Sequence, residues 1–154
     1  MGTGAEIRLG EVQVMSAGTG VRHSEFNASN SALVHFLQIW IVPKFTGVKP
    51  GYQQAFFDPA EKRGKLRLLA SRDGRDGSLT VWQDVDFYGA LLDGEEQINY
   101  RLPEGRLAYV HVARGEVTLN GQRLAAGDGV KIEKESALAL TQGKGAEILL
   151  FDLA

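Results

Sequence analysis

The amino-acid sequence predicts an all-β fold, either a sandwich or a barrel, and three observations support this class. Apolar and polar residues alternate over many short segments, as in strands with one buried face. Nineteen glycines against four prolines among 154 residues favour many tight turns. Only residues 58–64 show helical signals, with Asp58 as the cap, Pro59 at the first position and Gly64 as the stop. Many short strands separated by turns are typical of sandwiches and barrels.

Each predicted strand is a short alternating stretch that ends at turn residues. Strands are expected at residues 5–9, 12–15, 35–42, 66–71, 79–83, 86–91, 97–102, 107–113, 116–119, 130–133, 137–141 and 146–152. The pair Asn120-Gly121, between two apolar segments, is the strongest hairpin signal. Residues 43–64 are polar and rich in turn formers, which predicts a connection between two β units.

Composition narrows the class of protein. The formal net charge of −2, without long charge runs, argues against a general binder of nucleic acid or membrane surfaces. The absence of cysteine excludes disulfides, thiolate catalysis and zinc–thiolate sites. No apolar stretch approaches the ~20 residues of a membrane-spanning helix. We therefore expect a cytoplasmic protein with a packed core.

One segment has the pattern of a metal site. A strand ending near Met15 leads into a glycine-rich corner at residues 17–20, and a second predicted strand contains His23 and Glu25. Residues two apart on a strand point to the same face, so both side chains can enter one cavity. Imidazole nitrogen and carboxylate oxygen suit iron, manganese, nickel, copper or zinc, although two ligands do not complete a site. The alternative is a surface pair held only by hydrogen bonds.

The same segment resembles a known family. Gly20, His23 and Asn27 match the end of the second cupin motif, in which a glycine precedes the metal-binding histidine and an asparagine follows it. The wider string LGEVQVMSAGTGVRHSE, residues 9–25, resembles the pirin family, as do LQIWI at residues 37–41 and LFDL at residues 150–153. The resemblance covers essentially the whole chain.

The resemblance implies a bicupin, two double-stranded β-helix barrels, with one metal, usually iron, in the first barrel. Three histidines and a glutamate hold that metal in the family. His23 matches the third histidine and Glu25 matches the glutamate, whereas the upstream His-x-His pair is absent from this sequence. We therefore expect a truncated chain with a partial site, iron or another divalent transition metal in the complete protein, and no bound metal in this chain.

The resemblance also implies a domain plan. Residues 1–50 are expected to form the C-terminal part of the first, incomplete barrel, residues 51–64 the connection, and residues 65–154 the second barrel. Missing strands would leave open edges, which predicts a homo-oligomer. His35 and His111 lie in alternating segments without companion ligands, so we expect structural roles for both.

Three functional hypotheses remain open at this point. The complete protein resembles a quercetin 2,3-dioxygenase, with a flavonol-type substrate and Glu25 as ligand or base, and this chain would be inactive without the upstream ligands. The first alternative is a non-enzymatic, metal-dependent regulator or redox sensor. The second is a degenerate structural remnant.

Overall fold

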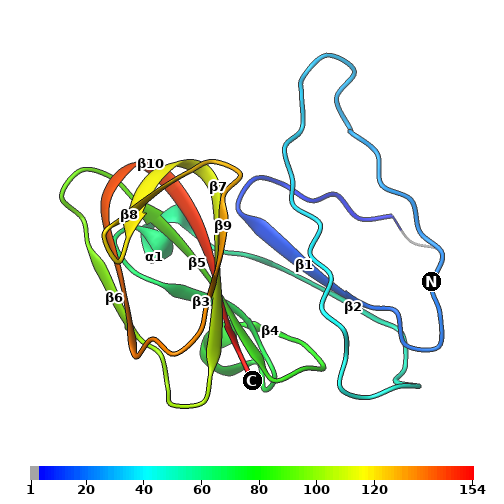
Figure 1. The fold of residues 1–154 in the computed structure, drawn as a ribbon. Coiled ribbons are helices and arrows are strands. Elements are labelled where there is room, and N and C mark those ends of the chain that lie inside the picture. The colour runs from blue at the N-terminus through cyan, green and yellow to red at the C-terminus, as the bar shows by residue number, and fades with distance from the viewer. Residues whose placement is uncertain (1–3) are drawn as a thin grey trace.

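The computed structural model describes residues 4–154, and most of its regular elements are strands. They form two sheets of unequal size (Figure 1). The smaller sheet pairs β1 (Glu11–Ser16) with β2 (Gly51–Phe56) antiparallel. The eight-stranded sheet contains β3 (Arg67–Ser71), β4 (Leu79–Thr80), β5 (Val85–Leu92), β6 (Ile98–Arg101), β7 (Leu107–Leu119), β8 (Gln122–Ala125), β9 (Gly129–Ile132) and β10 (Ala137–Leu153). The predicted all-β class is confirmed.

The two longest strands, β7 and β10, organise the eight-stranded sheet. Residues 146–153 of β10 pair with β5, whereas residues 137–140 pair with β6. The register between β10 and β7 shifts in between, and Gly115 lies there with φ 70°. A Cβ on Gly115 would lie 2.4 Å from the carbonyl oxygen of Lys144, so no other residue fits. Such irregularities bend strands, and the sheet accordingly folds over on itself (Figure 1).

The folded sheet encloses a single apolar core. Its buried residues come from six strands and the adjoining turn: Ala90, Leu92, Ile98, Leu102, Ala108, Val110, Val112, Val117, Leu119, Leu124, Ile132, Leu138, Leu140, Ala146, Ile148 and Leu150. Alternation along β10 puts Ile148 and Leu150 into this core and Phe151 on the opposite face. The core is therefore supplied by alternate residues, as the sequence pattern predicted.

The two-stranded sheet lies against the outer face of the eight-stranded sheet. Val12, Val14 and Ala55 pack there against a second cluster that includes Phe87 and Phe151. The side-chain amide of Gln53 also binds the backbone of Thr80. It donates to the Thr80 carbonyl oxygen at 2.9 Å and accepts from the Thr80 N–H at 3.0 Å. One face of the two-stranded sheet is thereby covered.

Two local predictions are confirmed by backbone geometry. Asn120 and Gly121 have φ 46° and 83°, and they join β7 to β8 with Leu119 opposite Gln122. Two successive positive φ values are the requirement of the tight hairpin turn that this residue pair favours. Helix α1 (Pro59–Lys62) begins after Asp58, whose carboxylate accepts from the N–H of Ala60 at 2.8 Å.

Other local predictions are wrong. Residues 5–9 and 35–42 are not strands, and residues 17–50 contain neither helix nor strand. Their alternating apolar pattern meets no neighbouring strand, and a strand exists only through hydrogen bonds to a partner. Two strands were not predicted: β2, which lies with α1 in residues 51–64, and β8, which is short and polar. Conversely, β7 and β10 were each predicted as two strands.

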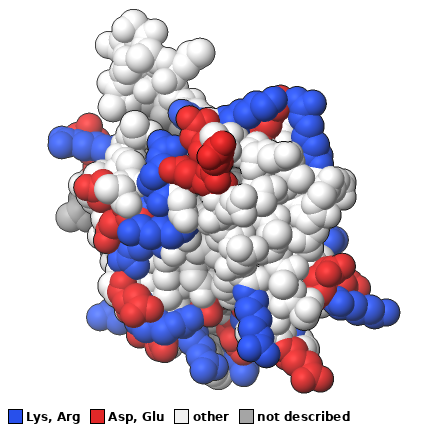
Figure 2. Space-filling model, turned by 90° about the vertical axis from the view of Figure 1, so that its left-hand side faces the viewer, with Lys and Arg blue, Asp and Glu red and all other residues white. Residues whose placement is uncertain are grey.

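Charged side chains of both signs are interspersed on the surface. On the side shown in Figure 2, they border a broad central area without charges. Within residues 4–154, no helix has the length and apolar character needed to cross a membrane.

Candidate metal-ligand pair and its surroundings

Strand β1 separates an apolar from a polar face. Val12 and Val14 face the eight-stranded sheet, so Glu11 and Gln13 project from the opposite, uncovered side. Residues opposite them in β2 continue this side, with Gln54 facing Gln13 and Tyr52 facing Met15. The two-stranded sheet therefore presents a polar face beside the predicted ligands.

His23 and Glu25 lie together next to this face. The Nδ1 atom of His23 is 3.8 Å from the Oε1 atom of Glu25. The amide nitrogen of Gln13 donates to the same Oε1 atom at 3.3 Å. The side chains of His23 and Glu25 are 40% and 34% exposed, so water reaches both. The structure therefore brings the predicted pair together, and Gln13 orients the carboxylate.

The local backbone differs from the prediction, because His23 and Glu25 lie in extended chain and not in a strand. Gly18, at φ 53°, makes the preceding corner, and a Cβ there would lie 2.0 Å from the carbonyl oxygen of Val48. The corner is therefore held against residues that lead into β2. Within the described part of the chain, residues 4–154, no strand is paired with residues 21–27, which explains why the pair is exposed instead of lining a closed cavity.

A hydrogen-bond network on the polar face was missed at the level of sequence. Gln54 donates to the Glu11 carboxylate at 3.0 Å and to the carbonyl oxygen of Glu6 at 2.9 Å, and the Tyr52 hydroxyl donates to Gln54. Burial, and after it the Glu11 carboxylate, raise the pKa of the Tyr52 hydroxyl. Polar residues at alternate positions of β1 and β2 are the signal that could have revealed this face.

The fit of a metal to this site is partial. His23 and Glu25 offer donors that divalent transition metals accept. Among residues 4–154, however, no group of three or more histidine, cysteine, aspartate or glutamate side chains is placed to hold one ion. His35 instead accepts a hydrogen bond from Arg114 at 3.2 Å, and His111 lies within β7. Two protein donors leave most of a coordination sphere to water, so these residues alone do not form a complete centre.

Comparison with known families places this chain among the cupin proteins. Residues 68–153 match the model of the quercetinase C-terminal cupin domain, and residues 1–41 match the model of the pirin family. The chain therefore belongs to the pirin family.

Relatives and solved structures agree with this assignment. The chain is 42% identical over 153 residues to a quercetin 2,3-dioxygenase of Escherichia coli K12, matching 99% of this chain and 65% of that protein. It is 38% identical over 146 residues to a pirin-like protein of Caulobacter vibrioides, matching 94% of this chain and 62% of that protein. The crystal structure of Escherichia coli YhhW superposes with a TM-score of 0.93 at 40% identity, over 100% of this chain and 64% of that one. The chain thus spans less than two thirds of the length of these proteins.

A second solved structure bears on the metal. Escherichia coli YhhW in complex with nickel(II) matches with a TM-score of 0.86 and 42% identity, over 94% of this chain and 61% of that one. A divalent metal is therefore bound by a protein similar to this chain.

Proposed function

We propose that His23 and Glu25 are two ligands of a divalent transition-metal site in a pirin-type oxidoreductase of the quercetin 2,3-dioxygenase kind. The observation that carries the proposal is the approach of His23 Nδ1 and Glu25 Oε1 to 3.8 Å beside the polar face of β1. The names of the relatives supply the substrate class, a flavonol, and the nickel complex supplies a precedent for a divalent metal. Iron is the metal that the family resemblance implies.

The proposal assigns separate tasks to three side chains. His23 offers a neutral imidazole nitrogen and Glu25 a carboxylate oxygen to one ion. Gln13 donates to Glu25 Oε1, which leaves the second carboxylate oxygen, Oε2, for the metal or for a substrate proton. The remaining ligands would come from a second chain or from further polypeptide, because among residues 4–154 no third histidine, aspartate or glutamate is placed to share an ion with this pair. The bound metal would supply Lewis-acid and redox chemistry.

Ligand number sets the expected behaviour of residues 1–154 on their own. The side chains of His23 and Glu25 are 40% and 34% exposed, and together they can form only a few bonds to a metal ion. We therefore propose that this chain binds nickel or iron with micromolar or weaker affinity and cleaves quercetin near the background rate. The division into a partial first cupin unit, residues 1–50, and a second unit, residues 65–154, belongs to the same proposal.

Calorimetric titration of the chain with Ni²⁺, and anaerobically with Fe²⁺, tests the ligand assignment. Binding should disappear in His23→Ala and Glu25→Gln and weaken in Gln13→Leu. His111→Ala is the matched control, since it removes a histidine from β7 without touching the polar face, and it should bind as the unmodified chain does. Equal affinity in His23→Ala and the unmodified chain would refute the assignment.

Measurements of oxygen uptake and of the loss of quercetin absorbance test the proposal that residues 1–154 cleave quercetin near the background rate. Turnover by residues 1–154 at rates typical of an enzyme, with metal held stoichiometrically, would overturn the expectation of weak binding and low activity.

A further inference from the structure

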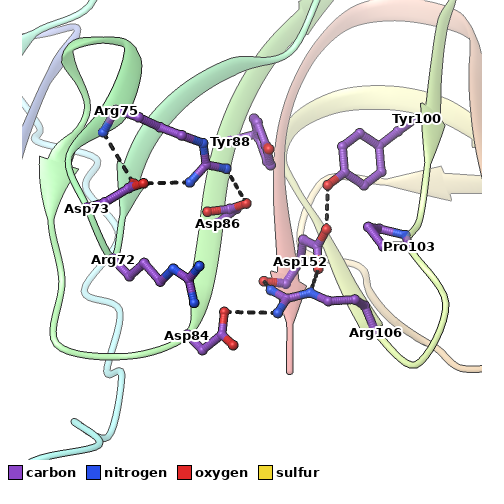
Figure 3. A pocket seen from close by; sticks show the side chains of 10 residues that line it. All are labelled: Arg72, Asp73, Arg75, Asp84, Asp86, Tyr88, Tyr100, Pro103, Arg106 and Asp152. Carbon is purple, nitrogen blue, oxygen red and sulfur yellow. Dashed lines mark hydrogen bonds and ion pairs between the residues drawn. The ribbon is translucent and has the colours of Figure 1, made fainter.

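A polar pocket of about 530 Å³ opens beside the folded eight-stranded sheet, and neither His23 nor Glu25 lines it (Figure 3). Its lining comes from β5, β6 and β10, from the loop between β3 and β4, and from the loops before β5 and β7. Three arginines, Arg72, Arg75 and Arg106, line it together with aspartates and two tyrosines, Tyr88 and Tyr100.

The floor of the pocket is a buried ion-pair network. Asp152 is only 2% exposed, although it is charged. Arg106 binds its carboxylate through Nε and its carbonyl oxygen through Nη2, the latter at 2.9 Å, and the Tyr100 hydroxyl donates to Oδ2 at 2.5 Å. Arg106 also donates to Asp84 Oδ1 at 2.9 Å. Buried charges are tolerated only when paired and hydrogen-bonded, and these bonds hold the floor in one arrangement.

The rim of the pocket retains unused hydrogen-bonding groups. Arg75 binds Asp86 Oδ2, which leaves Asp86 Oδ1 without a partner in residues 4–154, and Asp84 Oδ2 is likewise unused there. The side chain of Arg72 makes no hydrogen bond or ion pair within the same residues. Figure 3 shows its guanidinium group pointing into the space between Asp84 and Asp86. Donors and acceptors therefore alternate around one opening.

The charges indicate which kind of molecule fits. Three arginines and four aspartates line the pocket, so it is nearly neutral and attracts neither a strong anion nor a strong cation. The carboxylates do not form a metal-holding group among the described residues. A hydroxyl group both donates and accepts, so neighbouring hydroxyls can bind a carboxylate oxygen and a guanidinium N–H together. The rings of Tyr88 and Tyr100, with centroids 5.5 Å apart, add an apolar edge.

We infer that this pocket binds a small, neutral, polyhydroxylated molecule of the sugar or polyol class. Asp84 Oδ2 and Asp86 Oδ1 accept from its hydroxyls, Arg72 donates to them, and the tyrosine rings contact its C–H face. The purely structural alternative, a network that only braces the sheet, accounts for Asp152 and Arg106 and for the attraction of Arg72 to Asp84. It leaves Asp84 Oδ2 and Asp86 Oδ1 without a hydrogen-bond donor among residues 4–154. The inference does not depend on the metal site.

Titration of the ¹⁵N-labelled, metal-free chain with three sugars that differ mainly in charge tests the inference by NMR. D-glucose should cause saturable shifts in amides around Arg72, Asp86 and Tyr88. Neutral D-glucose should bind more tightly than anionic D-glucuronate and cationic D-glucosamine. Tighter binding of either charged sugar, or no saturable shift with D-glucose, would overturn it.

Two variants sharpen the test. Arg72→Ala removes a side chain that forms no hydrogen bond or ion pair within residues 4–154, so the fold should be unaffected while D-glucose affinity falls roughly tenfold or more. Arg123→Ala removes an arginine that pairs with Glu116 at 2.6 Å outside the pocket and should leave the affinity unchanged. Equal affinities of the Arg72→Ala and Arg123→Ala chains would show that the shifts do not report on this pocket.

Discussion

The two parts of this chain have similar apolar content but opposite outcomes. In the eight-stranded sheet, alternate residues form a core in which Val110, Leu140 and Leu150 are fully buried. Among described residues before Phe57, none is buried. That region instead exposes large apolar side chains, including Phe26, Leu33 and Trp40.

An alternating pattern becomes structure only where strands find partners, and the two regions differ in this respect. The strands of the eight-stranded sheet pair with one another and close over their own core. The two-stranded sheet covers one face through Val12 and Val14, but its other face and residues 17–50 have no strands beside them. Burial of apolar surface drives folding, so the two regions should differ sharply in stability.

Hydrogen exchange should show the largest contrast. Amides of β7 and β10 lie in the most extensively paired strands, so they should exchange only through global unfolding, at about 5–15 kcal/mol. Amides of residues 17–50 have almost no backbone hydrogen bonds and should exchange with little protection. Exchange measured by NMR or mass spectrometry reports both regions at once. Uniform protection along the chain would contradict the expected difference in stability between the two regions.

A matched pair of leucine substitutions should separate the regions next. Leu150→Ala opens a cavity at a fully buried position and should lower the free energy of unfolding by about 2–5 kcal/mol. Leu33→Ala makes the same chemical change at a fully exposed position and should change it by less than about 0.5 kcal/mol. Urea unfolding followed by circular dichroism measures both. Similar losses would mean that residues 17–50 are packed in solution.

The buried network at the pocket floor should make stability depend on alkaline pH. Burial, and after it the hydrogen bond to Asp152, raise the pKa of Tyr100 above its ordinary value of 10.0. The folded protein then keeps this hydroxyl neutral at a pH where the unfolded chain ionises it. Its contribution is fully present below about pH 10 and is lost as the pH rises above that value.

In Tyr100→Phe, the free energy of unfolding should therefore decrease less as the pH rises into the alkaline range. At neutral pH it should cost about 1–3 kcal/mol, because Asp152 loses a hydrogen bond in a buried site. Tyr109→Phe is the control, at a ring that packs on Phe151 with centroids 6.0 Å apart. Parallel stability curves for the unmodified chain and Tyr100→Phe between pH 8 and about pH 11 would contradict the assignment.

Self-association should be the smallest effect and would involve only the exposed region. Exposed apolar patches and unpaired strand edges favour contacts between chains, so we expect a dimer or larger assembly at micromolar concentration. Trp40→Ser, at an 87% exposed position, should weaken association roughly tenfold, whereas Trp82→Ser outside this region should not. Light scattering that shows a monomer at all concentrations would refute the expectation.

Local features that depend on a few neighbouring residues were predictable. The hairpin at Asn120-Gly121 and the cap at Asp58 follow from backbone preferences that hold in almost any context. The pairing of His23 with Glu25 was also predictable, because their spacing and the glycine corner keep them close. The orienting role of Gln13 was not, since it depends on how the corner returns toward β1.

The all-β class, the turns, the family and the two candidate ligands could be identified from the amino-acid sequence, because each depends on side-chain type and short spacing. Tertiary contacts were needed to show that residues 35–42 form no strand, that β7 and β10 run unbroken past their bulges, and that Arg72 and Asp86 face one pocket. These outcomes depend on which strands become neighbours and on charges brought together from distant segments. Pairing partners and buried ion networks are long-range properties, and a local pattern does not contain them.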